Sequence, residues 1–471
     1  MSVTIKGSKK GMMFRKAMMV LFGLLCAFEV SAISGYKITL KSNLKDHKVY
    51  IWYNYGENKY PLDTSMTNAE GVAVFEKPYE LTGGVFILYL TPRKALEFLM
   101  TDENVFAINI DTADISGKTT FTGSRENNLY YDFLRKMNFN NYQKELIQDK
   151  YTQQKANSKT DSLQILRAMV EAYEKQEESI QKQTIDKNPK TFLADLISAS
   201  FKERDKFDGD MYKHKVMVKK HFFDRVNFAD ERLAYSPVLF NLYEKYILDL
   251  SFKSGDSLIA ACDTILKKAS AGKENFKWSL YFLSSSFERS TVPGQDQVFV
   301  HLVEEYYKKG KCWWLTKEQM DNMARRADVL KHLFVGSLCP DFTAIDSSEK
   351  ASTLHSKINK LTVLYFWAYD CKHCLEETPK LVAWMKKHPN INLVTACATP
   401  DEDKWKEKLK EFKMPGFHFI DPELKANYNY VYSITATPQI FVLDKNKKIL
   451  GKYIDDTKAL DEFMKAYKLI H

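Results

Sequence analysis

Hydrophobic and polar residues alternate with a period of two in the first third of the chain, as in half-buried strands. Ile38 and Leu40 alternate with polar residues, and further short runs are rich in β-branched and aromatic residues. Gly and Asn lie between these runs, where turns are expected. The pattern predicts an N-terminal β-sandwich domain over residues 33–124. The predicted strands after the first are 49–53, 72–75, 85–90 and 105–110.

The spacing changes to that of helices in the middle of the chain. Leu163, Leu166, Val170 and Tyr173 recur on one helical face. A later segment repeats this spacing with Leu258, Cys262, Ile265 and Leu266. The pattern predicts a central all-α domain over residues 125–333. Its residues carry no spacing that assigns it a chemistry.

The last third of the chain mixes both patterns. Gly336 and Pro340 mark residues 334–341 as a hinge into a third domain. Strands and helices then alternate in the order strand, helix, strand, helix, strand, strand, helix, which predicts an α/β domain over residues 334–471. The predicted strands are 361–366, 391–396, 439–443 and 449–453, and the last helix is 457–467.

The first 32 residues read as a signal peptide. Basic residues up to Lys16 precede an apolar run over 17–28, and Val-Ser-Ala at 30–32 supplies small residues for cleavage. The apolar run is short for a membrane span. We therefore expect export to the periplasm or cell envelope. Lipid anchoring at Cys26 ranks second because Leu25 is bulky where such sites favour a small residue.

Composition narrows the classes of function only a little. The chain has 471 residues, 45% hydrophobic and 27% charged, as expected of a globular protein. The net charge is +9, of which the first 32 residues contribute +4 through five basic residues and one acidic residue. The remaining +5 is spread without a basic block. Binding to nucleic acid therefore has little support.

Cys371 and Cys374 carry the clearest chemistry in the chain. They follow a buried-looking strand and begin a probable helix. The unpaired backbone N–H groups and dipole of a helix start favour a thiolate at Cys371, and the thiolate is the form that attacks a disulfide. Cys374 lies one turn later and can resolve the mixed disulfide. A structural disulfide and half of a zinc site are the alternatives, but zinc needs four ligands and no second cysteine pair exists.

Residues 367–374, which read Trp-Ala-Tyr-Asp-Cys-Lys-His-Cys, resemble the active site of the thioredoxin superfamily. Residues 336–342, Gly-Ser-Leu-Cys-Pro-Asp-Phe, resemble the entry segment of its exported TlpA and ResA type reductases. The resemblance covers residues 336–471 and implies a thioredoxin fold there. The β domain resembles the sandwich that some multidomain exported members carry at their N-terminus.

The resemblance implies further site residues. Pro379 matches the proline that kinks the active-site helix, and Thr437-Pro438 matches the cis-proline segment that faces the sulfurs and binds a substrate strand. Glu377 matches the acidic residue that exported members place after the resolving cysteine. It is expected to move a proton to or from Cys374 if burial raises its pKa. Trp367 is expected to pack beside the cysteines.

The chain also departs from the family pattern. Tyr365 stands where cytoplasmic thioredoxins carry a buried Asp. Lys372 and His373 lie between the cysteines, where such reductases usually place a proline before the second cysteine. Protonated Lys372 and His373 would stabilise a Cys371 thiolate and make the disulfide more oxidising. The direction of electron flow therefore stays open.

Together these features predict an exported thiol–disulfide oxidoreductase that acts on thiols and disulfides of protein substrates. The resemblance implies an inner-membrane electron donor, and no cofactor beyond the redox-active Cys371–Cys374 disulfide and no metal is expected. The main alternative is a scaffold that uses the third domain for docking. A peroxidase is disfavoured because Ala368 stands where peroxiredoxins need Thr, and a copper chaperone would want a wider cysteine spacing.

The remaining cysteines suggest packing more than chemistry. Cys397 ends a predicted strand and Cys339 lies in the predicted hinge, and both are treated as buried small hydrophobes by default. Cys262 lies on an apolar helix stripe, which predicts a core position. His418, His301 and His221 are isolated in the sequence and are expected to be core or surface residues.

Overall fold

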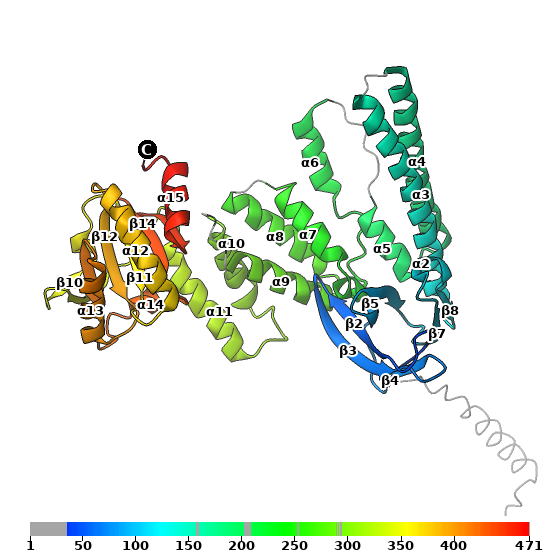
Figure 1. Ribbon diagram of the computed structural model, residues 1–471, viewed down its shortest axis with the longest axis horizontal. Coiled ribbons are helices and arrows are strands. Elements are labelled where there is room, and N and C mark those ends of the chain that lie inside the picture. Colours follow the sequence, from blue (N-terminus) through cyan, green and yellow to red (C-terminus); the bar gives the residue numbers. More distant parts are fainter. Residues whose placement is uncertain are drawn as a thin grey trace, which may run out of the picture. The chain divides into compact units, whose positions relative to one another are not determined.

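The computed structural model describes residues 35–156, 160–201, 209–251, 254–288, 290, 292 and 294–470 (Figure 1). The predicted signal peptide at 1–32, with Cys26, lies outside the described residues. The chain divides into two compact units, Met1–Glu203 with Tyr235–Pro237, and Arg204–Ala234 with Val238–His471. This division falls inside the predicted helical domain, so the predicted boundaries at 124/125 and 333/334 stay predictions.

The N-terminal region is built from two four-stranded sheets, with strand orders β4-β1-β7-β8 and β3-β2-β5-β6. Neighbouring strands are antiparallel except for β1 and β7, which are parallel. The predicted β region is confirmed. The strands are β1 (Tyr36–Ser42), β2 (Lys48–Tyr55), β3 (Asn58–Met66), β4 (Val72–Lys77), β5 (Gly84–Thr91), β6 (Lys94–Met100), β7 (Val105–Ile110) and β8 (Thr120–Thr122).

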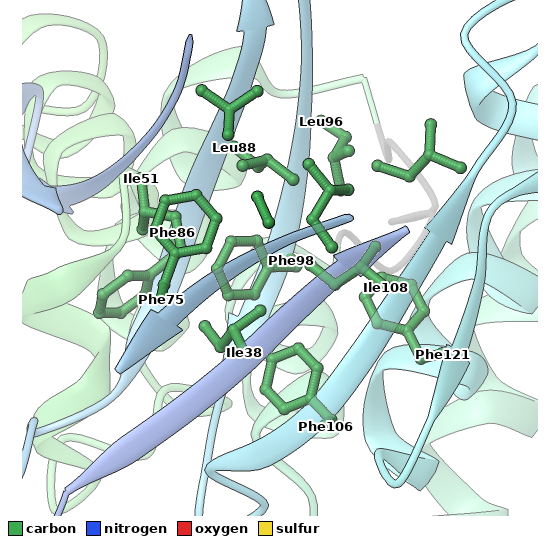
Figure 2. Close-up of a cluster of buried hydrophobic side chains, with 14 of the residues drawn as sticks. Ile38, Ile51, Phe75, Phe86, Leu88, Leu96, Phe98, Phe106, Ile108 and Phe121 are labelled. Atoms are coloured by element: carbon green, nitrogen blue, oxygen red, sulfur yellow. The ribbon is translucent and has the colours of Figure 1, made fainter. Parts of the chain in front are cut away.

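Side chains from both sheets form one hydrophobic core (Figure 2). Ile38 and Phe106 come from the first sheet, and Ile51 and Phe98 from the second; all are buried. Because β1 buries every second residue, the alternation in the sequence has a direct structural counterpart.

Strands β3, β6 and β8 were not predicted. No residue of β3 is buried, and it contains Pro61, so its sequence lacks an apolar face. Strand β6 reads Lys-Ala-Leu-Glu-Phe-Leu-Met, a composition with strong helix formers, yet it pairs along its length with β5. Tertiary pairing overrides local preference in this strand.

The predicted helical region is confirmed in both units. In the first unit, α3 and α4 lie side by side (Figure 1), and the side-chain amide of Asn140 donates to the Tyr173 carbonyl at 2.9 Å. Leu166 is buried on the predicted face of α4. The helices of this unit are α2 (Ile115–Lys118), α3 (Arg125–Ala156), α4 (Thr160–Lys187) and α5 (Phe192–Ser200).

The second unit begins with helices. In α8, Leu258, Cys262, Ile265 and Leu266 are all buried, which confirms the predicted core stripe. Tyr235, the last residue of η1, belongs to the first unit. The elements are α6 (Met211–His221), η1 (Glu231–Tyr235), α7 (Val238–Leu248), α8 (Gly255–Ala269), α9 (Lys273–Glu288), α10 (Asp296–Leu302), the π-helical η2 (Val303–Tyr307), α11 (Lys317–Leu330) and η3 (Lys331–Leu333).

The same unit ends in a seven-stranded mixed sheet of order β10-β9-β13-β12-β11-β14-β15. The strands predicted at 361–366, 391–396, 439–443 and 449–453 are confirmed within one residue, whereas short β9, β10 and β13 were not predicted. The elements are β9 (Thr343–Asp346), β10 (Ala351–Thr353), η4 (His355–Lys357), β11 (Thr362–Trp367), α12 (Lys372–Lys387), β12 (Asn392–Cys397), α13 (Glu402–Phe412), β13 (Phe417–Ile420), α14 (Tyr428–Val431), β14 (Gln439–Leu443), β15 (Ile449–Ile454) and α15 (Thr457–Ala466).

Hydrogen bonds hold the predicted hinge at 334–341 against this sheet. The Gly336 N–H donates to the Ile449 carbonyl at 2.7 Å, and the Cys339 N–H donates to the Lys447 carbonyl at 2.8 Å. A buried ion pair between Lys452 of β15 and Asp296 of α10 joins the sheet to the helices of the same unit. The segment is therefore anchored at both its glycine and its cysteine, unlike a free hinge. Within the described residues, no helix is long and apolar enough to cross a membrane.

Candidate active site

The two motif cysteines lie at the carboxyl end of β11, where it leads into α12. Every residue of β11 and β12 is buried, and the two strands run parallel with Trp367 opposite Cys397. A parallel pair of this kind needs a crossover, here α12, and leaves the strand ends and the helix start at one edge of the sheet. The sequence pattern of a buried strand followed by a cysteine pair predicted this placement.

Cys371 is the N-cap of α12, and the backbone N–H of Cys374 donates to its Sγ at 3.3 Å. Cys371 is partly exposed, whereas Cys374 is fully buried. Both cysteines are free thiols in the structure. The Cys371 sulfur is therefore open to solvent, and the Cys374 sulfur lies one helical turn further along α12, away from solvent.

The pKa values of the two thiols are shifted in opposite directions. Burial raises the pKa of Cys371, but hydrogen bonds from Cys374, from Thr437 and from the backbone at His373 outweigh burial and lower this pKa below its ordinary value. Burial, aided by the hydrogen bond with Cys371, raises the pKa of Cys374 to about 12. The partly exposed sulfur is therefore the more acidic of the two, and the buried one keeps its proton at neutral pH.

The predicted cis bond between Thr437 and Pro438 is confirmed. It lies directly before β14, the antiparallel neighbour of β11. The Cys371 thiol donates to the Thr437 carbonyl with a sulfur–oxygen distance of 3.2 Å. The structure therefore brings Thr437 to the reactive sulfur across 66 residues of sequence.

Glu377 lacks the raised pKa on which its expected role as a proton relay for Cys374 depended. Burial favours its neutral form, but hydrogen bonds from Lys380 and from the Thr457 backbone, with the charge of Lys380, lower its pKa below the ordinary value. Its Oε2 accepts from the Thr457 N–H at 3.2 Å, and its Oε1 pairs with Lys380 at 2.5 Å. The sequence does not show that α15 begins beside this carboxylate, and a relay role for Glu377 stays a prediction.

Lys372 and His373 are both exposed on the first turn of α12. His373 lowers the Cys371 pKa through its backbone N–H. A tuning role for the two charged side chains stays a prediction. Pro379 lies inside α12, as predicted.

Trp367 is fully buried and belongs to the same hydrophobic cluster as Cys374 and Cys397. Its indole Nε1 is buried and makes no hydrogen bond within the described residues. The predicted packing of Trp367 beside the cysteines therefore agrees with the structure.

Tyr365 and Thr378 form a hydrogen-bonded chain from β11 to the backbone of Cys374, and Thr378 was not predicted from the sequence. The Tyr365 hydroxyl is hydrogen-bonded to Thr378 Oγ1 at 3.1 Å, and Thr378 Oγ1 donates to the Cys374 carbonyl at 2.7 Å. Burial raises the pKa of Tyr365, so its phenol stays neutral. The spacing of four from Cys374 to Thr378 was the signal that pointed to this helix contact.

The other cysteines within the described residues, Cys262, Cys312, Cys339 and Cys397, are buried. Cys397 contacts Thr399 Oγ1 at 3.5 Å, and burial raises its pKa. Cys339 lies 3.6 Å from the His355 ring, and burial raises its pKa to about 11. Among the described residues, no group of three or more His, Cys, Asp or Glu side chains is arranged to hold a metal ion.

The region that contains the dithiol is similar to known proteins. A family model described as thioredoxin-like matches residues 359–449. Thioredoxin-like protein YneN of Bacillus subtilis (strain 168) is 27% identical over 112 residues, which are 23% of this chain and 65% of the relative. The chain thus spans just under two thirds of the length of this curated relative.

Solved structures give related matches. A thioredoxin-like protein from Bacteroides caccae ATCC 43185 is 16% identical, with 56% of this chain and 97% of that chain covered and a TM-score of 0.46. A domain of a possible thiol-disulfide isomerase from Cytophaga hutchinsonii ATCC 33406 is 30% identical, with 29% and 94% covered and a TM-score of 0.27.

The match to the family model contains both cysteines, Glu377 and the cis-proline bond within one continuous stretch. The C-terminal part of this larger chain is therefore a thioredoxin-like domain.

Proposed function

We propose that this chain is a thiol–disulfide oxidoreductase that exchanges the Cys371–Cys374 dithiol with disulfides of protein substrates, as a reductant or an isomerase. One observation carries the proposal: the two thiols differ in both exposure and acidity. The partly exposed Cys371 has a lowered pKa, and the buried Cys374 has a raised one. An attacking sulfur must be ionised and accessible, and a resolving sulfur must wait until the mixed disulfide forms.

The exchange balances without a cofactor. The Cys371 thiolate attacks one sulfur of the substrate disulfide; a new S–S bond forms, the substrate bond breaks, and one substrate thiolate leaves. Cys374 then attacks Cys371 Sγ, and its proton passes to a released substrate sulfur. Two electrons have moved from the protein to the substrate, and an external dithiol must supply two electrons to restore the starting state.

We assign substrate positioning to the segment around Thr437 and Pro438. Its backbone lies beside the reactive sulfur, with the Thr437 carbonyl 3.2 Å from Cys371 Sγ. A substrate strand that pairs with this backbone would place its disulfide next to Cys371. In this arrangement the Thr437 carbonyl must release the Cys371 thiol when the thiolate forms.

Insulin reduction by the full chain with dithiothreitol tests the activity. We expect Cys371→Ala to lower the rate by about a thousandfold, because the nucleophile is lost. Cys397→Ala is the matched control, since it removes a buried thiol from the same edge of the sheet. Equal rates for Cys371→Ala and the parent chain would remove the proposal and favour a docking module.

Alkylation tests the acidity directly. At pH 7, iodoacetamide should label Cys371 at least about tenfold faster than an ordinary thiol of pKa near 8.5. Because the pKa of Cys371 is lowered, the labelling rate should begin to fall at a lower pH than that of an ordinary thiol as the pH is reduced. Cys374 should stay unlabelled over this range. Labelling of Cys371 no faster than glutathione would contradict the proposal.

We also propose export and an inner-membrane electron donor, as the N-terminal sequence and the resemblance imply. The support for export is the basic and apolar segment that ends at Ala32. Mass spectrometry of the mature protein from a cell-envelope fraction should find a chain that begins at Ile33. A full-length chain in the cytoplasm would exclude this placement.

A further inference from the structure

A second concave site lies among the helices of the C-terminal unit, and no residue of the dithiol site lines it. Its volume is about 700 Å³, and it is formed by α8, α9, η2 and the segment 310–313. This volume lies within the range of sites that enclose small organic molecules. The sequence analysis assigned no chemistry to this part of the chain.

One wall of this pocket is aromatic and aliphatic. The rings of Phe276 and Trp313 are stacked, with centroids 6.0 Å apart and planes 15° apart. Tyr306 lies 6.1 Å from Phe276, and buried Leu266 completes the wall. Trp313 lines the pocket and is 58% exposed, so part of its large flat apolar ring is open to solvent.

The rest of the lining consists of three lysines with Ser270 and Gly310. Lys267 lies in the last turn of α8, Lys273 begins α9, and the Lys311 Nζ lies 4.4 Å from the centre of the Tyr306 ring. No acidic residue lines the pocket. In the described part of the chain, none of these three lysines forms a salt bridge.

Neighbouring lysines outside the pocket behave differently. Lys277 pairs with Glu274 at 3.4 Å, and Lys309 pairs with Glu305 at 2.6 Å. Asp263, the carboxylate beside Tyr306, accepts a hydrogen bond from the Tyr306 hydroxyl and contacts the His301 ring. The three pocket lysines thus form no salt bridge among the described residues, although two carboxylates lie near them: Glu231 accepts from the Lys273 backbone N–H at 2.8 Å, and Glu305 interacts electrostatically with Lys311.

We propose that this pocket binds a small amphipathic anion, with a flat or branched apolar body and a carboxylate, sulfonate or phosphate group. The body lies on the Phe276–Trp313 wall, where its burial removes apolar surface from water. The anionic group pairs with Lys273 and Lys311, whose ammonium groups donate charge-assisted hydrogen bonds. A neutral analogue makes the apolar contact with the aromatic wall and lacks the ionic contact with the lysines.

Fluorescence titration of the full chain with 1-anilinonaphthalene-8-sulfonate tests the site. We expect one saturable site, and we expect neutral N-phenyl-1-naphthylamine to bind about tenfold more weakly. The double variant Lys273→Gln/Lys311→Gln should lose about tenfold in affinity for the sulfonate and leave the affinity for the neutral probe unchanged. Trp313→Ala should weaken both probes.

Lys277→Gln is the matched control, because it removes a lysine of the same helix that is paired outside the pocket. Its affinity for the sulfonate should equal that of the parent chain, and thermal melting checks that every variant folds. Equal affinity of the sulfonate for the parent and the double lysine variant would overturn the proposal. Displacement of the sulfonate by polyglutamate, with no displacement by 2-naphthoate, would also overturn it, since it would indicate an acidic peptide surface.

Discussion

The two β regions of this chain place their side chains in different ways. In the N-terminal region, almost all neighbouring strands are antiparallel, and one aliphatic and aromatic core fills the space between the sheets. No cysteine occurs between residue 35 and residue 261. In the C-terminal region, parallel β11 and β12 bring a helix start, two thiols and Cys397 to one sheet edge.

The difference shows how connectivity decides where chemistry is available. Hairpins between antiparallel strands alternate between the two ends of a sheet, so polar groups at strand ends are dispersed. In β11 and β12 the parallel pair is joined by the crossover helix α12, and the start of that helix offers backbone N–H groups beside the ends of the strands. Cys371 uses these groups, and nothing comparable is formed in the N-terminal sheets among the described residues.

The variant with the largest expected effect removes the resolving sulfur of the C-terminal region. Cys374→Ser should trap substrates as mixed disulfides on Cys371 and lower turnover by about a thousandfold, because the second exchange step is lost. Non-reducing electrophoresis with insulin as substrate measures the trapped complex. Cys397→Ser is the control and should turn over normally. Absence of a trapped species would mean that Cys374 does not resolve.

A second test perturbs the other β region. Phe98 is fully buried, with ring centroids 5.9 Å from both Phe86 and Phe106. Phe98→Ala should lower the free energy of unfolding of the N-terminal unit by about 3–5 kcal/mol, because a cavity is left in the core. Urea unfolding measures this loss.

The same variant should leave iodoacetamide labelling of Cys371 unchanged, since the two regions have separate cores. Val74→Ala, at an exposed position of β4, is the control and should change stability by less than about 0.5 kcal/mol. A slower labelling rate in Phe98→Ala would show that the two regions are energetically coupled.

A third test uses pH. His418 is buried, and burial lowers its pKa to about 4. Between pH 6.5 and pH 4 the unfolded chain binds a proton that the folded chain excludes, so stability is full above pH 6.5 and falls as the pH drops. The loss should reach about 1.4 kcal/mol per pH unit within this window.

Urea unfolding of the C-terminal unit at pH 7 and pH 5 measures this slope, and His418→Gln should reduce it. The exposed His332→Gln serves as the control, with the slope of the parent chain. An unchanged slope in His418→Gln would show that His418 is protonated in the folded state.

The smallest expected effect concerns Glu377. Because this carboxylate is ionised and paired with Lys380, Glu377→Gln should change the rate of insulin reduction by less than about tenfold, whereas loss of a proton relay would cost about 10²–10⁴-fold. Glu376→Gln, at the exposed neighbouring position, is the control. A loss in the larger range would restore the relay that the family resemblance implies.

Several elements could be predicted because burial leaves a pattern in the residues themselves. β1 alternates, β11 and β12 are apolar throughout, and α8 repeats its apolar residues at helical spacing. Strands β3 and β6 left no such pattern. The first is exposed, and the second has the composition of a helix, so only their pairing with β2 and β5 makes them strands.

The candidate active site was likewise predictable only in part. The spacing of Cys371 and Cys374 after a buried strand indicated a dithiol at a helix start, and the Thr437–Pro438 cis bond followed from the family resemblance. The lowered pKa of Glu377 could not be predicted, because Thr457 lies 80 residues away. The basic and aromatic pocket was equally hidden, since its lining comes from separate helices.

The sequence by itself determined the dithiol and the strand that carries it, because both depend on neighbouring residues and on a local repeat. Tertiary structure alone decided which sulfur is exposed, which carboxylate is ionised and which lysines share a cavity. Those properties depend on desolvation and on hydrogen-bond partners from remote segments, and such contacts exist only once the chain is folded.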